Sequence, residues 1–189
     1  MKNVWLFGDS IRLNYQHVVK RELDGECSVF SPAENGKFAK YTLCMLFQWS
    51  ADYPKPDVIH WNNGIWDAFR FHPGKGPLTS VEDYCRDTLL IADALASTGA
   101  KLIFATSTPT RAPLVSTGRE ELRRTDVIRL NEAVVPLLKD RGVLINDLYA
   151  TVCRDEAKFI SEDGIHLSND GMEVAGRQTA GMIRSALQA

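Results

Sequence analysis

Short apolar runs alternate along the chain with longer segments in which apolar residues recur every three or four positions. The runs predict buried strands at residues 3–7, 28–30, 57–61, 101–105 and 143–146. The recurring positions predict helices at residues 11–23, 41–49, 81–97, 119–141 and 169–187. Strands that alternate with helices indicate parallel strands joined by right-handed crossovers. We therefore expect an α/β fold, a three-layer α/β/α sandwich.

Local signals mark some of the predicted boundaries. The third helix follows Thr79-Ser80-Val81-Glu82, which has the capping-box pattern, and Gly99 is expected to end it. A polar loop containing proline is predicted at residues 106–118, before the fourth helix.

Composition and charge are those of an ordinary globular protein. The 189 residues suit a single domain spanning 1–189, with 44% hydrophobic and 24% charged residues. A net charge of -2 gives no indication of a nucleic-acid or membrane partner, and no particular oligomeric state is indicated. The four cysteines form no C-x-x-C pair, which argues against zinc or a redox dithiol. Without a signal-peptide pattern or a run of about 20 apolar residues, a cytoplasmic location is expected.

Polar residues follow each predicted strand, which is where ligands bind in folds of this kind. The clusters after the first three strands are Gly8-Asp9-Ser10, Asn35-Gly36 and Asn62-Asn63-Gly64-Ile65-Trp66-Asp67. Those after the last two strands are residues 106–111 and Asp163-Gly164-Ile165-His166-Leu167. Because the carboxyl ends of parallel strands lie at one edge of a sheet, we expect these clusters to form one site.

Ser10, His166 and Asp163 have the residue types and spacing of a catalytic triad. A serine nucleophile needs a general base, and that histidine needs an acceptor on its second ring nitrogen. Asp163 and His166 are three residues apart, so the carboxylate can reach Nδ1 while Nε2 faces Ser10. Taken alone, Ser10 fits a helix N-cap better than a nucleophile, and Asp163-x-x-His166 equally fits a turn with a solvated histidine. Their joint occurrence at strand ends favours the triad.

A tetrahedral intermediate also needs preorganised hydrogen-bond donors, each contributing about 10²–10³ in rate. The backbone N–H groups of Ser10 and Gly36, with a side-chain amide of Asn62 or Asn63, are the candidates for this oxyanion hole. The two asparagines also suit a simple turn before Gly64.

Three motifs resemble blocks of the SGNH (GDSL-type) hydrolase family, and together they extend along nearly the whole chain. "FGDSI" resembles the first block, with Ile11 in place of the usual leucine, and "DGIHLSNDG" resembles the last block, D-x-x-H-x-x-x-x-G. "ENGKFAKYT" is similar to the second block. The resemblance implies that Ser10 is the nucleophile and first oxyanion donor, His166 the base and Asp163 its orienting carboxylate. It implies that Gly36 is the second oxyanion donor.

The third block departs from the family pattern. The family usually has G-x-N-D, whereas this chain reads "NNGIWD", which puts Trp66 in the place of the asparagine. Because tryptophan has no side-chain amide, we predict that Asn63 takes over the donor role, with Asn62 as second choice. The resemblance further implies a flavodoxin-like fold with a five-stranded parallel sheet in the order 2-1-3-4-5. It also implies hydrolysis of a small-molecule ester with no metal or organic cofactor.

Aromatic residues cluster after the third strand and suit either the core or a substrate pocket. They are Trp61, Trp66, Phe69 and Phe71. Trp66 is the aromatic candidate for substrate contact, and Arg111, with Arg12, is the candidate for contact with a polar alcohol group. These residues favour a small acyl group, acetyl first, on a polar alcohol such as a carbohydrate. The alternatives are an acyl-thioesterase or lysophospholipase with the same triad, and a non-catalytic flavodoxin-like binding module.

Overall fold

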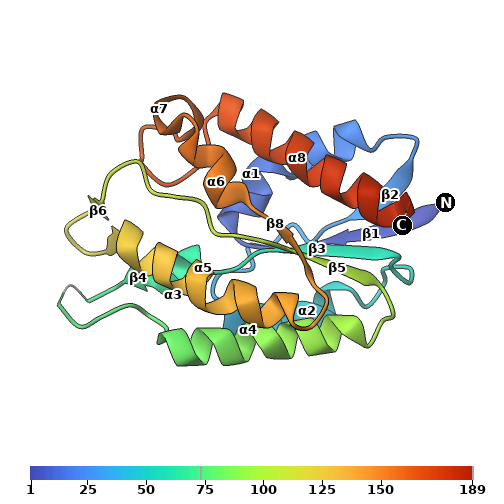
Figure 1. The fold of residues 1–189 in the computed structure, drawn as a ribbon, viewed down its shortest axis with the longest axis horizontal. Coiled ribbons are helices and arrows are strands. Elements are labelled where there is room, and N and C mark those ends of the chain that lie inside the picture. The colour runs from blue at the N-terminus through green and yellow to red at the C-terminus, as the bar shows by residue number, and fades with distance from the viewer. Residues whose placement is uncertain (73, 189) are drawn as a thin grey trace.

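A central parallel sheet of five strands organises the chain, for which a computed structural model describes residues 1–72 and 74–188 (Figure 1). The strands are β1 (Lys2–Leu6), β2 (Cys27–Phe30), β3 (Val58–Trp61), β5 (Lys101–Ala105) and β8 (Leu144–Asn146). They lie in the order β2-β1-β3-β5-β8, and every neighbouring pair is parallel. Along the chain these are the first to fifth strands of this sheet, so the predicted order 2-1-3-4-5 is confirmed.

Helices cover both faces of this sheet, as Figure 1 shows. One face carries α1 (Ser10–Glu22), α6 (Leu148–Cys153), α7 (Glu156–Phe159) and α8 (Asn169–Gln188). The other face carries α2 (Ala39–Trp49), α3 (Ile65–Ala68), α4 (Val81–Ala96) and α5 (Arg124–Lys139). A Cβ at Gly176 would lie 2.5 Å from the Cβ of Val18, so glycine allows α8 to pack closely against α1. The predicted three-layer α/β/α sandwich is confirmed.

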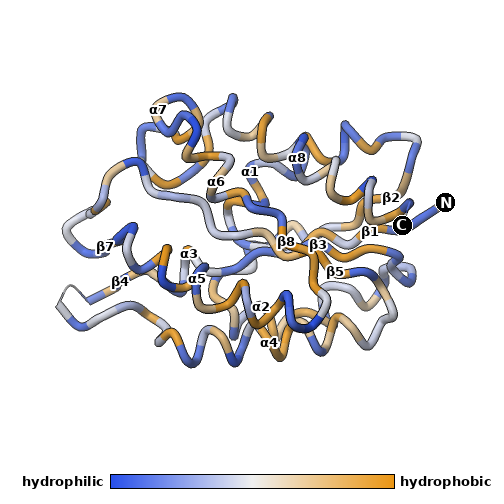
Figure 2. Tube along the Cα trace, in the orientation of Figure 1, coloured by the Kyte–Doolittle hydropathy of each residue, from blue (hydrophilic) through white to orange (hydrophobic). Residues whose placement is uncertain are grey.

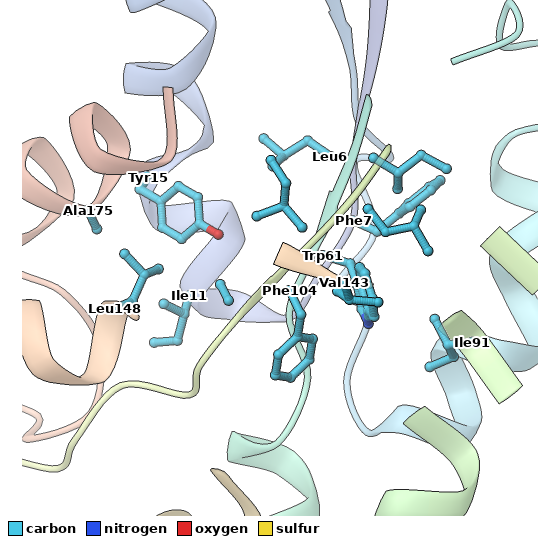
Figure 3. Close-up of a cluster of buried hydrophobic side chains, with 14 of the residues drawn as sticks. Leu6, Phe7, Ile11, Tyr15, Trp61, Ile91, Phe104, Val143, Leu148 and Ala175 are labelled. Atoms are coloured by element: carbon cyan, nitrogen blue, oxygen red, sulfur yellow. The ribbon is translucent and has the colours of Figure 1, made fainter. Parts of the chain in front are cut away.

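The core lies on both sides of the central strands, which are apolar along much of their length (Figure 2). Figure 3 shows Ile11 and Tyr15 on one side of the strands and Ile91 on the other. His60 is a polar residue within this apolar core, since it lies in β3, whose four residues are all buried. Its Nε2 lies 3.1 Å from Nδ2 of Asn146, and burial lowers its pKa to about 3, so the ring is neutral. None of the helices in the described residues is long and apolar enough to cross a membrane.

A second, antiparallel sheet lies at the end of the molecule opposite the chain termini (Figure 1). Its strands are β4 (Phe69–Arg70), β6 (Leu114–Ser116) and β7 (Glu121–Arg123), in the order β4-β7-β6. This sheet corrects the prediction of a loop at 106–118 and of a helix beginning at residue 119, because α5 begins only at Arg124. Leu122 is fully buried between two more exposed neighbours, so this segment alternates as a strand does.

The start of α4 also differs from the predicted capping box. Ser80 is the N-cap, and its hydroxyl accepts a hydrogen bond from the N–H of Asp83 at 3.1 Å. Thr79, the predicted cap, instead donates its hydroxyl to Oδ1 of Asp67 at 2.9 Å. The N-cap is therefore one residue later than the capping-box pattern indicates, while α4 begins at Val81 as predicted.

Candidate active site

The turn between β1 and α1 presents Ser10 at the carboxyl edge of the central sheet. Gly8 has a φ of 149°, and a Cβ there would lie 2.0 Å from Oδ1 of Asn62, so this position requires glycine. Asp9 is the N-cap of α1, because its Oδ1 accepts the N–H of Ile11 at 2.9 Å. The N-cap interpretation of Ser10 is thereby corrected: Ser10 is the first residue of α1, and its hydroxyl is not used for capping.

His166 and Asp163 lie next to Ser10, on the segment between α7 and α8. Nε2 of His166 lies 3.0 Å from Oγ of Ser10, and Nδ1 lies 2.6 Å from Oδ2 of Asp163. Oδ1 of Asp163 accepts the N–H groups of Ile165 and His166 at 2.8 and 2.9 Å and the hydroxyl of Ser161 at 2.8 Å. Partial burial acts to raise the pKa of Asp163, but these hydrogen bonds outweigh it and lower the pKa below its usual value. Asp163 is therefore ionised at neutral pH.

Backbone contacts fix the histidine segment to the rest of the molecule. The N–H of Leu167 donates to Oδ1 of Asn14 on α1 at 3.2 Å. The carbonyl of Gly164 accepts the N–H of Arg111 at 2.9 Å, and the Arg111 side chain is exposed. Arg111 supports the turn around Gly164 through its backbone and does not line the cavity beside Ser10.

A cavity of about 470 Å³ opens beside Ser10. Its lining residues are Ser10, Asn35, Ile65, Trp66, Phe69, Phe71, Val115, Thr117, Glu120, Asp163, Ile165 and His166. Trp66, Phe69 and Phe71 pack together, with ring centroids 5.8–6.3 Å apart, and form an aromatic wall. Trp61 is fully buried against Phe104 instead. Three of the four clustered aromatic residues thus line the cavity and one belongs to the core.

The predicted oxyanion donors other than Ser10 are already engaged in hydrogen bonds. The N–H of Gly36 donates to the carbonyl of Gly8 at 2.9 Å. Nδ2 of Asn63 donates to the Thr42 hydroxyl at 2.8 Å and to the carbonyl of Lys37 at 3.3 Å, and the residue is fully buried. Neither residue lines the cavity. The structure therefore does not support Gly36 or Asn63 as a donor to the oxyanion.

Asn62, the second choice, is engaged through one of its two amide hydrogens. Its Nδ2 donates to Oδ1 of Asp9 at 2.8 Å, and it is almost fully buried outside the cavity. This bond holds the carboxylate that caps α1. Asn62 therefore stabilises the turn that carries Ser10 through its hydrogen bond to Asp9.

Arg12 is a structural residue, which corrects its assignment to the substrate's alcohol group. Its guanidinium is fully buried and donates to the carbonyls of Pro32 at 2.8 Å, Gly8 at 3.2 Å and Glu34 at 2.6 Å. A buried charge needs such partners. Arg12 thus attaches the 32–36 loop to the Ser10 turn.

Several cavity residues were missed in the sequence. Val115, Thr117 and Glu120 belong to the β6–β7 hairpin, whose short strands give no clear apolar signal. Ile165 lies within the histidine motif itself. Asn35 lines the cavity, whereas the second motif indicated its neighbour Gly36. The motif therefore predicted the correct loop but not the residue of that loop that faces the cavity.

Asp67 is a fully buried carboxyl in the third motif, next to Trp66 in the chain. Its Oδ2 accepts the N–H of Ala39 at 3.1 Å, and Thr79 donates to its Oδ1. Burial raises its pKa to about 7, although these hydrogen bonds act to lower it. The folded protein therefore retains this proton at pH values where the unfolded chain has lost it.

We expect the free energy of unfolding to fall as pH rises from about 4 to about 7, because over this range the folded state binds one more proton than the unfolded state. About three pKa units correspond to a loss of about 4 kcal/mol. In Asp67→Asn, which cannot titrate here, urea unfolding between pH 4 and 8 should lose this part of the slope. Asp24→Asn, at an exposed carboxylate, is the control and should keep the wild-type slope. An unchanged slope in Asp67→Asn would contradict the prediction.

The parallel sheet in the order 2-1-3-4-5, with helices on both faces, has the flavodoxin-like order, and comparison with solved structures finds this fold in acylhydrolases, esterases and a GDSL-like lipase. A lipase/acylhydrolase from Enterococcus faecalis aligns with a TM-score of 0.79 at 20% identity, covering 98% of this chain and 96% of that chain. A carbohydrate acetylesterase family member from Sinorhizobium meliloti aligns with a TM-score of 0.77 at 13% identity, covering all of both chains. A GDSL-like lipase from Bacteroides thetaiotaomicron aligns with a TM-score of 0.70 at 13% identity, covering 99% and 88%.

No protein-family model and no curated protein matches the sequence. The resemblance to the SGNH (GDSL-type) family that the motifs indicate is thus confirmed in the fold. The roles of individual residues are a separate matter, because similarity at such low identity concerns the fold alone.

Proposed function

We propose that the protein is a serine esterase in which Ser10 is the nucleophile, His166 the general base and Asp163 the carboxylate that orients it. The observation that carries this proposal is the chain of contacts from Oδ2 of Asp163 to Oγ of Ser10, of 2.6 and 3.0 Å, at the wall of a cavity. A nucleophile, a base within hydrogen-bond distance and a third group that orients the base are the elements of covalent acyl transfer.

Asp163 determines which nitrogen of His166 carries the proton. An ionised carboxylate only accepts hydrogen bonds, so Nδ1 must be the protonated nitrogen. The lone pair on Nε2 then faces the hydroxyl of Ser10. This is the tautomer that a general base requires.

The reaction proceeds in two acyl transfers. Oγ of Ser10 attacks the acyl carbon while its proton passes to Nε2 of His166, and a tetrahedral oxyanion forms. Collapse breaks the bond to the alcohol oxygen, which takes the proton from Nε2 and leaves an acyl ester on Ser10. Water then attacks with Nε2 as base, and the carboxylic acid departs as Ser10 recovers its proton.

The preferred substrate in this proposal is an acetyl ester of a polar alcohol such as a carbohydrate. The aromatic wall of Trp66, Phe69 and Phe71 offers flat apolar faces for a sugar ring, and Thr117 and Glu120 add hydroxyl and carboxylate groups on the hairpin. Such a mixture of aromatic faces and a few polar groups is typical of small-molecule sites. One of the similar structures is a carbohydrate acetylesterase family member, which agrees with this preference.

A longer acyl group, as in a thioester or a lysophospholipid, is the second candidate. The aromatic wall continues into Ile65, Val115 and Ile165, so most of the cavity surface is apolar. Its volume of about 470 Å³ exceeds what an acetyl group occupies.

We also propose, from the separated and free cysteines, that this one-domain esterase works in a reducing compartment, the cytoplasm.

A panel of esters with acyl chains of two, four, eight and twelve carbons, on an aryl alcohol, on glucose and as thioesters, tests the proposal. Acetyl esters of the sugar are expected to give the highest kcat/KM. A preference for eight or twelve carbons would replace the acetyl assignment with the second candidate.

A fluorophosphonate probe should label Ser10, as located by peptide mass spectrometry. Failure both to be labelled and to hydrolyse any ester would favour a non-catalytic binding protein.

A further inference from the structure

The proposed reaction leaves the oxyanion of the tetrahedral intermediate short of donors. The N–H of Ser10 is available, because the first amides of a helix have no partner within it. The N–H of Gly36 and both N–H groups of the Asn63 amide are directed to other acceptors, and Asn62, which donates one N–H to Asp9, is buried outside the cavity. A single donor is unusual for acyl transfer, so a further donor must lie among the residues that line the cavity.

Asn35 is a cavity residue whose amide orientation is fixed by the backbone. Its Oδ1 accepts the N–H of Lys37 at 2.8 Å, in a turn that places Lys37 at a φ of 50°. Because a backbone N–H can only donate, the oxygen of the amide must face Lys37 and the NH₂ group must face the other way. Within residues 1–72 and 74–188, no acceptor is found for Nδ2 of Asn35. The donor thus remains available on a residue that borders the same cavity as Ser10 and His166.

The loop that carries Asn35 is held firmly against the Ser10 turn. The N–H of Gly36 donates to the carbonyl of Gly8, two residues before Ser10. A Cβ at Gly36 would lie 2.7 Å from that carbonyl oxygen, so the two backbones are in close contact. Arg12 also binds the carbonyl of Glu34, next to Asn35. These bonds fix Asn35 before any substrate arrives, which is the condition for stabilising a charge that develops in the transition state.

We propose that the side-chain amide of Asn35 donates from Nδ2 to the oxyanion and, with the N–H of Ser10, forms the oxyanion hole. This inference rests on the proposed esterase function. It gives Gly36 a different role from the predicted one, since its N–H anchors the loop while the preceding side chain contacts the reacting oxygen.

Asn35→Ser is the sharpest test. A serine hydroxyl can still accept the N–H of Lys37, so the turn is preserved, whereas the NH₂ donor is lost without adding a charge. We expect kcat for an acetyl ester to fall about 10²–10³-fold, with KM changed less than about threefold. The affinity for a trifluoromethyl ketone, which forms a charged hemiketal with a serine nucleophile, should fall by a similar factor. Asn35→Asp, which keeps the acceptor and the size, should show at least the same loss and replaces the serine variant if that does not fold.

Two control variants separate this role from others. Trp66→Phe keeps the aromatic ring but removes the indole N–H, which is another donor on a cavity residue. Because Trp66 also belongs to the aromatic wall, its KM can change, so the test compares the two losses in kcat, and the loss in Asn35→Ser should be the larger. A large loss in Trp66→Phe with none in Asn35→Ser would assign the donor to Trp66 and overturn the proposal. Asn35→Ala removes both the donor and the turn acceptor. If it loses activity while Asn35→Ser does not, Asn35 is only a positioning residue and the proposal is again overturned.

The failure of this inference is distinguishable from failure of the esterase proposal. A wild-type protein that hydrolyses esters and is labelled at Ser10, with Asn35→Ser equally active, would overturn only the role of Asn35. A wild-type protein that neither hydrolyses esters nor reacts with a fluorophosphonate would overturn both.

Discussion

Replacing Ser10 with alanine is expected to lower kcat for acetyl ester hydrolysis by about 10⁶-fold. Without Oγ no acyl-enzyme can form, and His166 has no hydroxyl to activate at 3.0 Å. The fold should persist, because Asp9 and not Ser10 caps α1. The single hydrogen bond lost corresponds to about 1 kcal/mol of stability. Steady-state kinetics with an activated acetyl ester, together with thermal unfolding, measures both effects.

Ser185→Ala is the matched control for this experiment. Ser185 is exposed on α8 and does not line the cavity, so its hydroxyl can be removed without touching the reaction. It should keep wild-type activity and fluorophosphonate labelling. Residual turnover above about one hundredth in purified Ser10→Ala, free of wild-type protein, would contradict the role of Ser10 as nucleophile.

The second large effect is expected for Asp163→Asn, with kcat reduced by about 10⁴-fold. The amide oxygen can still accept the N–H groups of Ile165 and His166, which places its NH₂ group against Nδ1. A donor at that position requires Nδ1 to be the unprotonated nitrogen. The proton then sits on Nε2, where it blocks the base that Ser10 needs. The loss should therefore appear in kcat, while thermal unfolding changes little.

Glu162→Gln controls for the removal of one negative charge at the same surface. Glu162 is exposed and adjacent to Asp163, but it makes no contact with the imidazole. Its activity should stay within about threefold of wild type. If Asp163→Asn retained more than a tenth of wild-type kcat, the orienting role of Asp163 would be refuted.

Much of the fold could be predicted from the sequence, because its main signals are strong and local. The inner strands of the central sheet, β1, β3 and β5, are buried along most of their length and therefore read as apolar runs. Alternation with helices then implies the parallel order. The β4-β7-β6 sheet could not be found in this way, since β7 has one buried residue, Leu122, between two polar ones. Three residues of alternation cannot be separated from the helix pattern that follows them.

The candidate site could likewise be predicted from the sequence only in part. Ser10, Asp163 and His166 could be brought together from the sequence because the parallel sheet places strand ends at one edge and the spacing of Asp163 and His166 fixes their pairing. The direction of an amide could not be predicted. It depends on the partner that each amide meets in the folded chain, which is the distant Thr42 for Asn63 and the backbone of Lys37, in a local turn, for Asn35.

The cavity is built on two separate supports. Ser10 and the aromatic residue Trp66 follow strands of the central sheet. Val115, Thr117 and Glu120 belong to a hairpin that, in the part of the chain that the structure describes, pairs with β4 and not with the central sheet. Substitutions at Thr117 and Glu120 can therefore reshape one wall without altering the elements that hold Ser10, whereas Val115 lies against Gly164 in the turn that carries His166. For laboratory evolution of the proposed esterase, Thr117 and Glu120 are therefore the positions to randomise first.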